Sequence, residues 1–118
     1  MIPDTKFRRL AVVEQFTDVC AAAELPQGTQ RLVRIGSEQI LLVRTADEVY
    51  AVDWLCPHAL QPLTGARIRN CTILCPRHGA RFDLRTGAPL NAVTDRHLRV
   101  YRACIASEHI HVELRVTD

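Results

Sequence analysis

Short runs of strand-forming residues, each bounded by polar turns, follow one another along this chain. Five runs have this character: residues 29–35, 39–44, 49–52, 100–106 and 110–114. Turn-forming residues separate neighbouring runs, as at Gly36-Ser37-Glu38. One stretch, residues 19–25, suits a helix, but Pro26 and Gly28 stop it, so a single helical turn is predicted. Short strands joined by close turns predict an antiparallel all-β domain.

Residues 53–92 break this pattern. They hold four of the six prolines and three of the five glycines, interleaved with cysteine and histidine. Proline interrupts the hydrogen-bond ladder of a sheet, so this region is not a pair of long strands. It is predicted to form loops carried on a small sheet, which is where binding residues tend to lie.

Composition excludes several classes of protein. The chain has 118 residues, of which 47% are hydrophobic and 24% charged, as expected for one globular domain with its own core. The formal net charge of +2 gives no field for nucleic-acid or membrane binding, and the eight arginines between residues 67 and 102 are predicted to form a solvated surface. Five cysteines, an odd number, exclude a complete disulfide framework and favour a reducing compartment. No apolar run is long enough for a signal peptide or a membrane span, so a cytoplasmic protein is predicted.

Two short boxes carry the candidate chemistry. The first contains Cys56 and His58, and the second contains Cys75 and His78 followed by Gly79, which lets the backbone pass close to a metal. Two thiolates and two imidazoles complete a four-ligand site. Zinc fingers place two cysteines in one box and two histidines in the other, whereas each box here is mixed. Mixed boxes suit a [2Fe-2S] cluster in which one iron takes two cysteines and the other takes two histidines, although zinc remains the alternative.

Residues 56–89 resemble the cluster-binding segment of Rieske-type ferredoxins, the soluble carriers that feed bacterial ring-hydroxylating dioxygenases and related oxygenases. The resemblance implies the Rieske fold for a single domain of residues 1–118. This fold is an antiparallel β-sandwich base with a small cluster-binding subdomain of loops, here at about residues 53–92. Residues 87–89 match the third loop that covers the cluster.

The same resemblance implies the cofactor and its ligands. One [2Fe-2S] cluster per chain is expected, with Cys56 and Cys75 on the buried iron and with His58 and His78 on an outer iron that reaches the surface. The chain would be an electron carrier and not an enzyme. Its partners would be a flavin-dependent reductase and a terminal oxygenase, with no nucleic acid and no membrane, and it would be a monomer. The alternative is a Rieske-like small subunit of a larger redox enzyme such as assimilatory nitrite reductase.

Departures from the family pattern predict a low reduction potential. Respiratory members have an extra cysteine after each box, and these two form a disulfide; the corresponding positions here are Gln61 and Arg77. Those members also place a serine and a tyrosine hydroxyl near the cluster sulfurs, where this chain has Ala80 and Phe82. Without these donors the chain resembles the low-potential branch.

Two histidines and a carboxylate lie in or directly before the last predicted strand. His109, His111 and Glu113 alternate along one face, and two histidines with a carboxylate can ligate a mononuclear iron. Such sites draw their ligands from a large catalytic domain, which 118 residues do not provide. These residues are therefore predicted to form the solvent-exposed face of a strand at the edge of its sheet. Three further cysteines are predicted to pack as small apolar residues: Cys20, Cys71 and Cys104.

Overall fold

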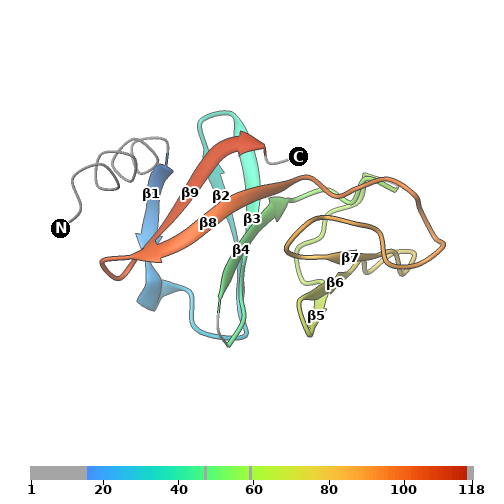
Figure 1. Ribbon diagram of the computed structural model, residues 1–118, viewed down its shortest axis with the longest axis horizontal. Coiled ribbons are helices and arrows are strands. Elements are labelled where there is room, and N and C mark those ends of the chain that lie inside the picture. Colours follow the sequence, from blue (N-terminus) through green and yellow to red (C-terminus); the bar gives the residue numbers. More distant parts are fainter. Residues whose placement is uncertain (1–15, 47, 59, 117–118) are drawn as a thin grey trace, which may run out of the picture.

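The computed structural model describes residues 16–46, 48–58 and 60–116. These residues form two antiparallel sheets (Figure 1). The strands are β1 (Phe16–Ala21), β2 (Gln30–Ile35), β3 (Glu38–Arg44), β4 (Val49–Asp53), β5 (Arg67–Arg69), β6 (Thr72–Leu74), β7 (Arg81–Asp83), β8 (Val100–Ala106) and β9 (His109–Val116). A single 3₁₀ turn, η1 (Ala22–Glu24), follows β1.

The base of the molecule is a six-stranded sheet in the order β1-β9-β8-β4-β3-β2. Each of the five predicted runs forms one of its strands: β2, β3, β4, β8 and β9. Strand β3 reads as continuously apolar because both of its faces are buried. Ile40 and Leu42 pack into one core, whereas Leu41 and Val43 pack into a second core that includes the small sheet.

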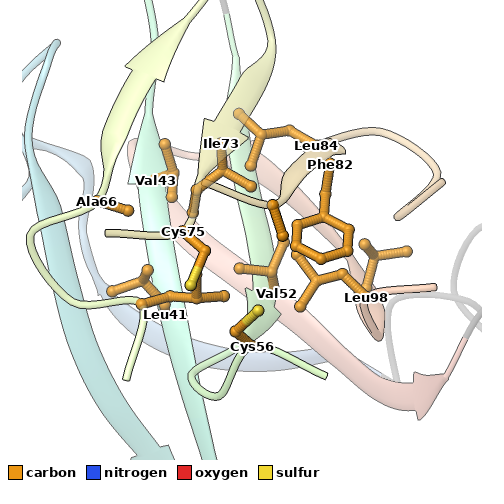
Figure 2. Packing of buried hydrophobic residues seen from close by; sticks show 13 residues of the cluster. Leu41, Val43, Val52, Cys56, Ala66, Ile73, Cys75, Phe82, Leu84 and Leu98 are labelled. Atoms are coloured by element: carbon orange, nitrogen blue, oxygen red, sulfur yellow. The ribbon is translucent and has the colours of Figure 1, made fainter. Parts of the chain in front are cut away.

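The small sheet holds β5, β6 and β7, each three residues long. Figure 1 shows it beside one end of the base sheet, away from β1. Its inner face contributes Ile73 and Phe82, both fully buried against Leu41 and Val52 (Figure 2). A base of antiparallel strands with loops on a small sheet confirms the predicted all-β fold class.

One link between the two sheets comes from a polar side chain. The Gln30 amide nitrogen donates to the carbonyl of Ala66, and the Gly65 amide donates to the Gln30 side-chain oxygen at 3.1 Å. Gln30 therefore fastens β2 to the loop that precedes β5.

Two local predictions need correction. Val19 lies in strand β1 and not in a helical turn, which covers only Ala22–Glu24. Strand β9 is not at an edge, because it pairs with both β1 and β8. Glu113 is accordingly 3% exposed, with its carboxylate 3.6 Å from the Arg102 guanidinium. The sequence pattern could not show this, because the pairing of β1 with β9 joins the two ends of the chain.

Candidate metal centre

The two ligand boxes fold into loops with the same backbone hydrogen bonds. In the first, the Cys56 amide donates to the carbonyl of Gln61 at 2.8 Å, and the Leu60 amide donates to the carbonyl of Cys56 at 2.7 Å. In the second, the Cys75 amide donates to the carbonyl of Ala80 at 2.7 Å, and the Gly79 amide donates to the carbonyl of Cys75 at 3.1 Å. Each cysteine thus begins a closed turn of the same size.

The fifth residue of each loop adopts a left-handed backbone conformation. In the second loop it is Gly79, with φ +77°, which glycine adopts freely. Among the described residues, apart from its two chain neighbours, no atom lies within 4 Å of a side-chain carbon built at Gly79, so its positive φ, and not a crowded neighbour in the chain, calls for glycine. In the first loop the equivalent residue is Leu60, with φ +53° and a side chain that is 68% exposed. A leucine in this conformation stores backbone strain.

The matched loops separate the four candidate ligands by burial. Cys56 and Cys75 are 0% and 1% exposed, neither is in a disulfide, and both belong to the core shared with the small sheet (Figure 2). His58 and His78 are exposed, and their ring centroids lie 5.1 Å apart with the rings nearly perpendicular. The spacing of two residues in one box and three in the other therefore brings both imidazoles together at the surface.

This donor arrangement fits a binuclear cluster. A [2Fe-2S] cluster of the mixed type needs two thiolates on one side and two imidazoles on the other. Within the described residues, no three cysteine, histidine, aspartate or glutamate side chains lie close enough to hold one metal ion together. A zinc site would instead place all four donors around a single ion.

The third loop packs against the same core. Gly87 is buried at φ +81°, and a side-chain carbon built there would overlap the carbonyl oxygen of Leu98. The Leu98 amide donates to the Gly87 carbonyl at 2.8 Å. An isolated bridge joins Phe82 to Pro89, which brings this loop beside the small sheet.

Ala80 and Phe82, which stand where respiratory members have a serine and a tyrosine, are both deeply buried. Ala80 and Phe82 are 0% exposed and belong to the same core as Cys56 and Cys75. Neither side chain can donate a hydrogen bond. An added hydroxyl at either position would thus enter a dry environment close to the cysteines.

The remaining cysteines and histidines stand apart from this centre. Cys20 is half-buried against the other core, and Cys104 is exposed rather than packed. Cys71, which sequence reasoning treated as apolar, is hydrogen-bonded to the Tyr50 hydroxyl at 3.3 Å. Burial and this hydrogen bond raise the pKa of Tyr50 to about 12. His109 on β9 contacts Asp18 on β1 at 2.9 Å.

Comparison with known proteins identifies the class that this fold and centre define. The sequence profile of the Rieske [2Fe-2S] domain family matches residues 15–102, so the chain belongs to that family. Its predicted cofactor, a [2Fe-2S] cluster, is thereby confirmed, as is the resemblance to Rieske-type ferredoxins.

Individual relatives are ferredoxins of dioxygenase systems. The chain is 28% identical over 103 residues to the ferredoxin component of the naphthalene 1,2-dioxygenase system of Pseudomonas aeruginosa, covering 87% of this chain and 99% of the relative. It is 30% identical over 95 residues to ferredoxin CarAc of Metapseudomonas resinovorans, covering 80% and 89%. A solved complex of reduced oxygenase and oxidized ferredoxin in carbazole 1,9a-dioxygenase contains a similar chain, with a TM-score of 0.78, 28% identity, and coverage of 87% and 96%.

Proposed function

We propose that Cys56 and Cys75 ligate one iron of the cluster and that His58 and His78 ligate the other. The observation that supports this is the separation of two buried thiols from two exposed imidazoles on loops with matching backbone hydrogen bonds. The whole chain, residues 1–118, would form one Rieske domain whose cluster-binding subdomain covers about residues 53–92.

The protein would act as a ferredoxin that carries one electron from a flavin-dependent reductase to a terminal oxygenase. The bound cluster supplies the one-electron chemistry. The chain's own contribution is to bury the two thiols, which excludes water from the sulfur side, and to expose the two imidazoles, which gives a partner a short path. The match to nearly the full length of a known ferredoxin supports a free, non-catalytic carrier over a subunit of a larger enzyme.

Partners would dock at the tip formed by the two ligand loops. Beside the imidazoles, Leu60, Pro76 and Arg77 are all exposed, and Ala59, which would complete this contact patch, lies outside the described residues. Contacts of this kind are small and transient. A monomer in the cytoplasm suits such a carrier, and none of the five cysteines is in a disulfide. No helix within residues 16–46, 48–58 and 60–116 is long and apolar enough to cross a membrane.

Metal content and spectroscopy test the ligand assignment. The purified protein should contain about two iron and two sulfide per chain and show the spectrum of a histidine-ligated cluster. Changing His58 or His78 to Cys should shift the spectrum of the reduced protein toward that of an all-thiolate cluster. Cys75→Ala should abolish the cluster, whereas Cys104→Ala, a control at an exposed cysteine, should leave it intact. Stoichiometric zinc in freshly purified protein would refute the cluster assignment.

A separate experiment tests tip docking. Arg77→Glu should change the rate and salt dependence of electron delivery to the partner while the cluster spectrum stays unchanged. If only charges remote from the two loops altered delivery, docking at the tip would be wrong.

A further inference from the structure

Charge is unevenly distributed between the two sheets. Residues 54–94, which include the small sheet and all three loops, hold five arginines and a single aspartate, a formal charge of +4 against +2 for the whole chain. Residues 1–53 hold eight carboxylates and six basic side chains. The end of the molecule that carries the metal centre is therefore basic, and the base sheet is not.

Three of these arginines project from the outer face of the small sheet. Strand register aligns Arg67 with Leu74 on β6, and Leu74 with Arg81 on β7. Arg69 stands one row further along β5, on the same face as Arg67. Because the alternate residues of these strands face the core, the three arginines point outward and are exposed. We call Arg67, Arg69 and Arg81 the arginine face.

The positive charge of the arginine face surrounds a hollow and is not neutralised by neighbouring carboxylates. Its three side chains surround a hollow of about 300 Å³ whose other lining residues are Asn70, Thr72 and Leu74. Within the described residues, none of the three arginines forms an ion pair. The one carboxylate on this face, Asp83, is held by Arg85 at 3.3 Å.

The arginine face is continuous with the ligand loops. Leu74 directly precedes Cys75, and Arg81 lies three residues after His78, so β6 and β7 run straight into and out of the second loop. Guanidinium groups bind carboxylates through two parallel hydrogen bonds. They are also more weakly hydrated than ammonium groups, so less free energy is lost when water is removed from them.

We propose that the arginine face is the lateral part of the docking surface and that it binds a carboxylate-rich surface on a redox partner. This inference rests on the proposed carrier function and specifies the chemistry of the partner. The tip provides the electron path, whereas the three arginines orient the partner and steer its approach. Unpaired arginines around a hollow, on the basic end of the molecule, match an acidic protein surface by charge complementarity.

Two haem proteins of opposite charge, cytochrome b5 (acidic) and cytochrome c (basic), serve as probes of this surface. Reduced holoprotein is mixed with each cytochrome at several ionic strengths, and haem reduction is followed optically. Reduction of cytochrome b5 by the wild-type protein should slow as salt rises. Arg69→Glu changes the local charge by two units. Acting on one partner carboxylate about 10 Å away in water, this change corresponds to roughly a fourfold loss of rate with cytochrome b5 at low salt. The rate with cytochrome c should rise, and Arg69→Gln should fall midway.

Arg34→Glu provides the matched control, since Arg34 is an exposed arginine on β2 in the base sheet. Equal effects of Arg34→Glu and Arg69→Glu would show that only net charge matters and would overturn the arginine face. Absence of salt dependence would overturn it too. Inorganic phosphate added at constant ionic strength should compete weakly; if it abolished the effect of Arg69, the hollow would be a small-anion site.

Binding measured without electron transfer separates this inference from the carrier function. Oxidised holoprotein is passed over immobilised cytochrome b5, and affinity is read by surface plasmon resonance. Arg67→Glu and Arg81→Glu should each weaken binding several-fold at low salt, and Arg34→Glu should not. A protein that reduced neither cytochrome would refute the proposed function, while this binding result would still decide the arginine face.

Discussion

Gly87 and Gly79 offer a matched pair of glycines with the same backbone requirement but different surroundings. Their φ angles are +81° and +77°. Beyond the two adjacent residues, a side-chain carbon at Gly79 meets no described atom within 4 Å, whereas at Gly87 it overlaps the Leu98 carbonyl and lies 3.2 Å from a methyl carbon of Val100. Within the polypeptide, substitution by alanine thus separates the cost of the clash at Gly87 from the cost of the left-handed conformation that both positions share.

The expected losses of stability differ several-fold. A left-handed alanine costs about 1–2 kcal/mol, partly offset by about 0.4–1 kcal/mol from the stiffer unfolded chain, so Gly79→Ala should lose about 1 kcal/mol. Gly87→Ala adds an overpacking cost of about 1–3 kcal/mol. Displacement of Leu98 also weakens its amide hydrogen bond to Gly87, worth about 1 kcal/mol. The total loss for Gly87→Ala should be about 3–5 kcal/mol.

Urea unfolding of the holoprotein, followed by far-ultraviolet circular dichroism, measures both changes. Midpoints should fall in the order wild type, Gly79→Ala, Gly87→Ala, with similar slopes. Equal losses for the two variants would show that the third loop moves away from Leu98 at little cost. The close packing of residues 87–89 against the base sheet would then not stabilise the fold.

Three further predictions concern the loops and their surroundings. Leu60→Gly should raise the free energy of unfolding by about 0.5 kcal/mol in urea titrations, because it relieves a left-handed leucine whose side chain is mostly exposed. The reduction potential should lie near the bottom of the histidine-ligated range, about −150 mV, and voltammetry should show Ala80→Ser and Phe82→Tyr each raising it by about 65–130 mV if the new hydroxyl reaches a sulfur; a wild-type value well above zero would contradict this. The Tyr50 phenol should ionise near pH 12 in an ultraviolet titration against Tyr50→Phe, with Cys71 as its hydrogen-bond partner. Because the unfolded phenol loses its proton first, its contribution to stability should disappear as the pH rises from about 10 towards 12, and ionisation near 10 would contradict the burial.

Local sequence signals were enough to predict five of the six strands of the base sheet and to propose the two ligand boxes. Turns such as Gly36-Ser37-Glu38 and the apolar runs beside them depend on neighbours in the chain, and the structure places β2 and β3 on either side of that turn. The two boxes were recognisable because ligand spacing is a local property as well. Their matching backbone geometry, however, was hidden by the different positions of His58 and His78 within them.

Features that depend on distant pairing could not be predicted. The burial of Glu113 follows from β1, which joins β9 from the opposite end of the chain. The Gln30 contacts with Gly65 and Ala66 span about a third of the sequence, and a glutamine carries no signal for such a role. Leu60 also gave no warning of its left-handed backbone, since glycine or asparagine is expected there.

Strand β3 limits how this sequence can diverge. Leu41 and Val43 face the core that holds Cys56 and Cys75, while Ile40 and Leu42 face the other core, so four successive positions tolerate no polar residue. A strand with one solvent-exposed face can tolerate substitutions at every second position, whereas both faces of β3 are buried. A mutational scan should therefore find its least tolerant stretch outside the ligand loops at residues 40–43, and a volume change on either face should reach the metal centre through the same backbone.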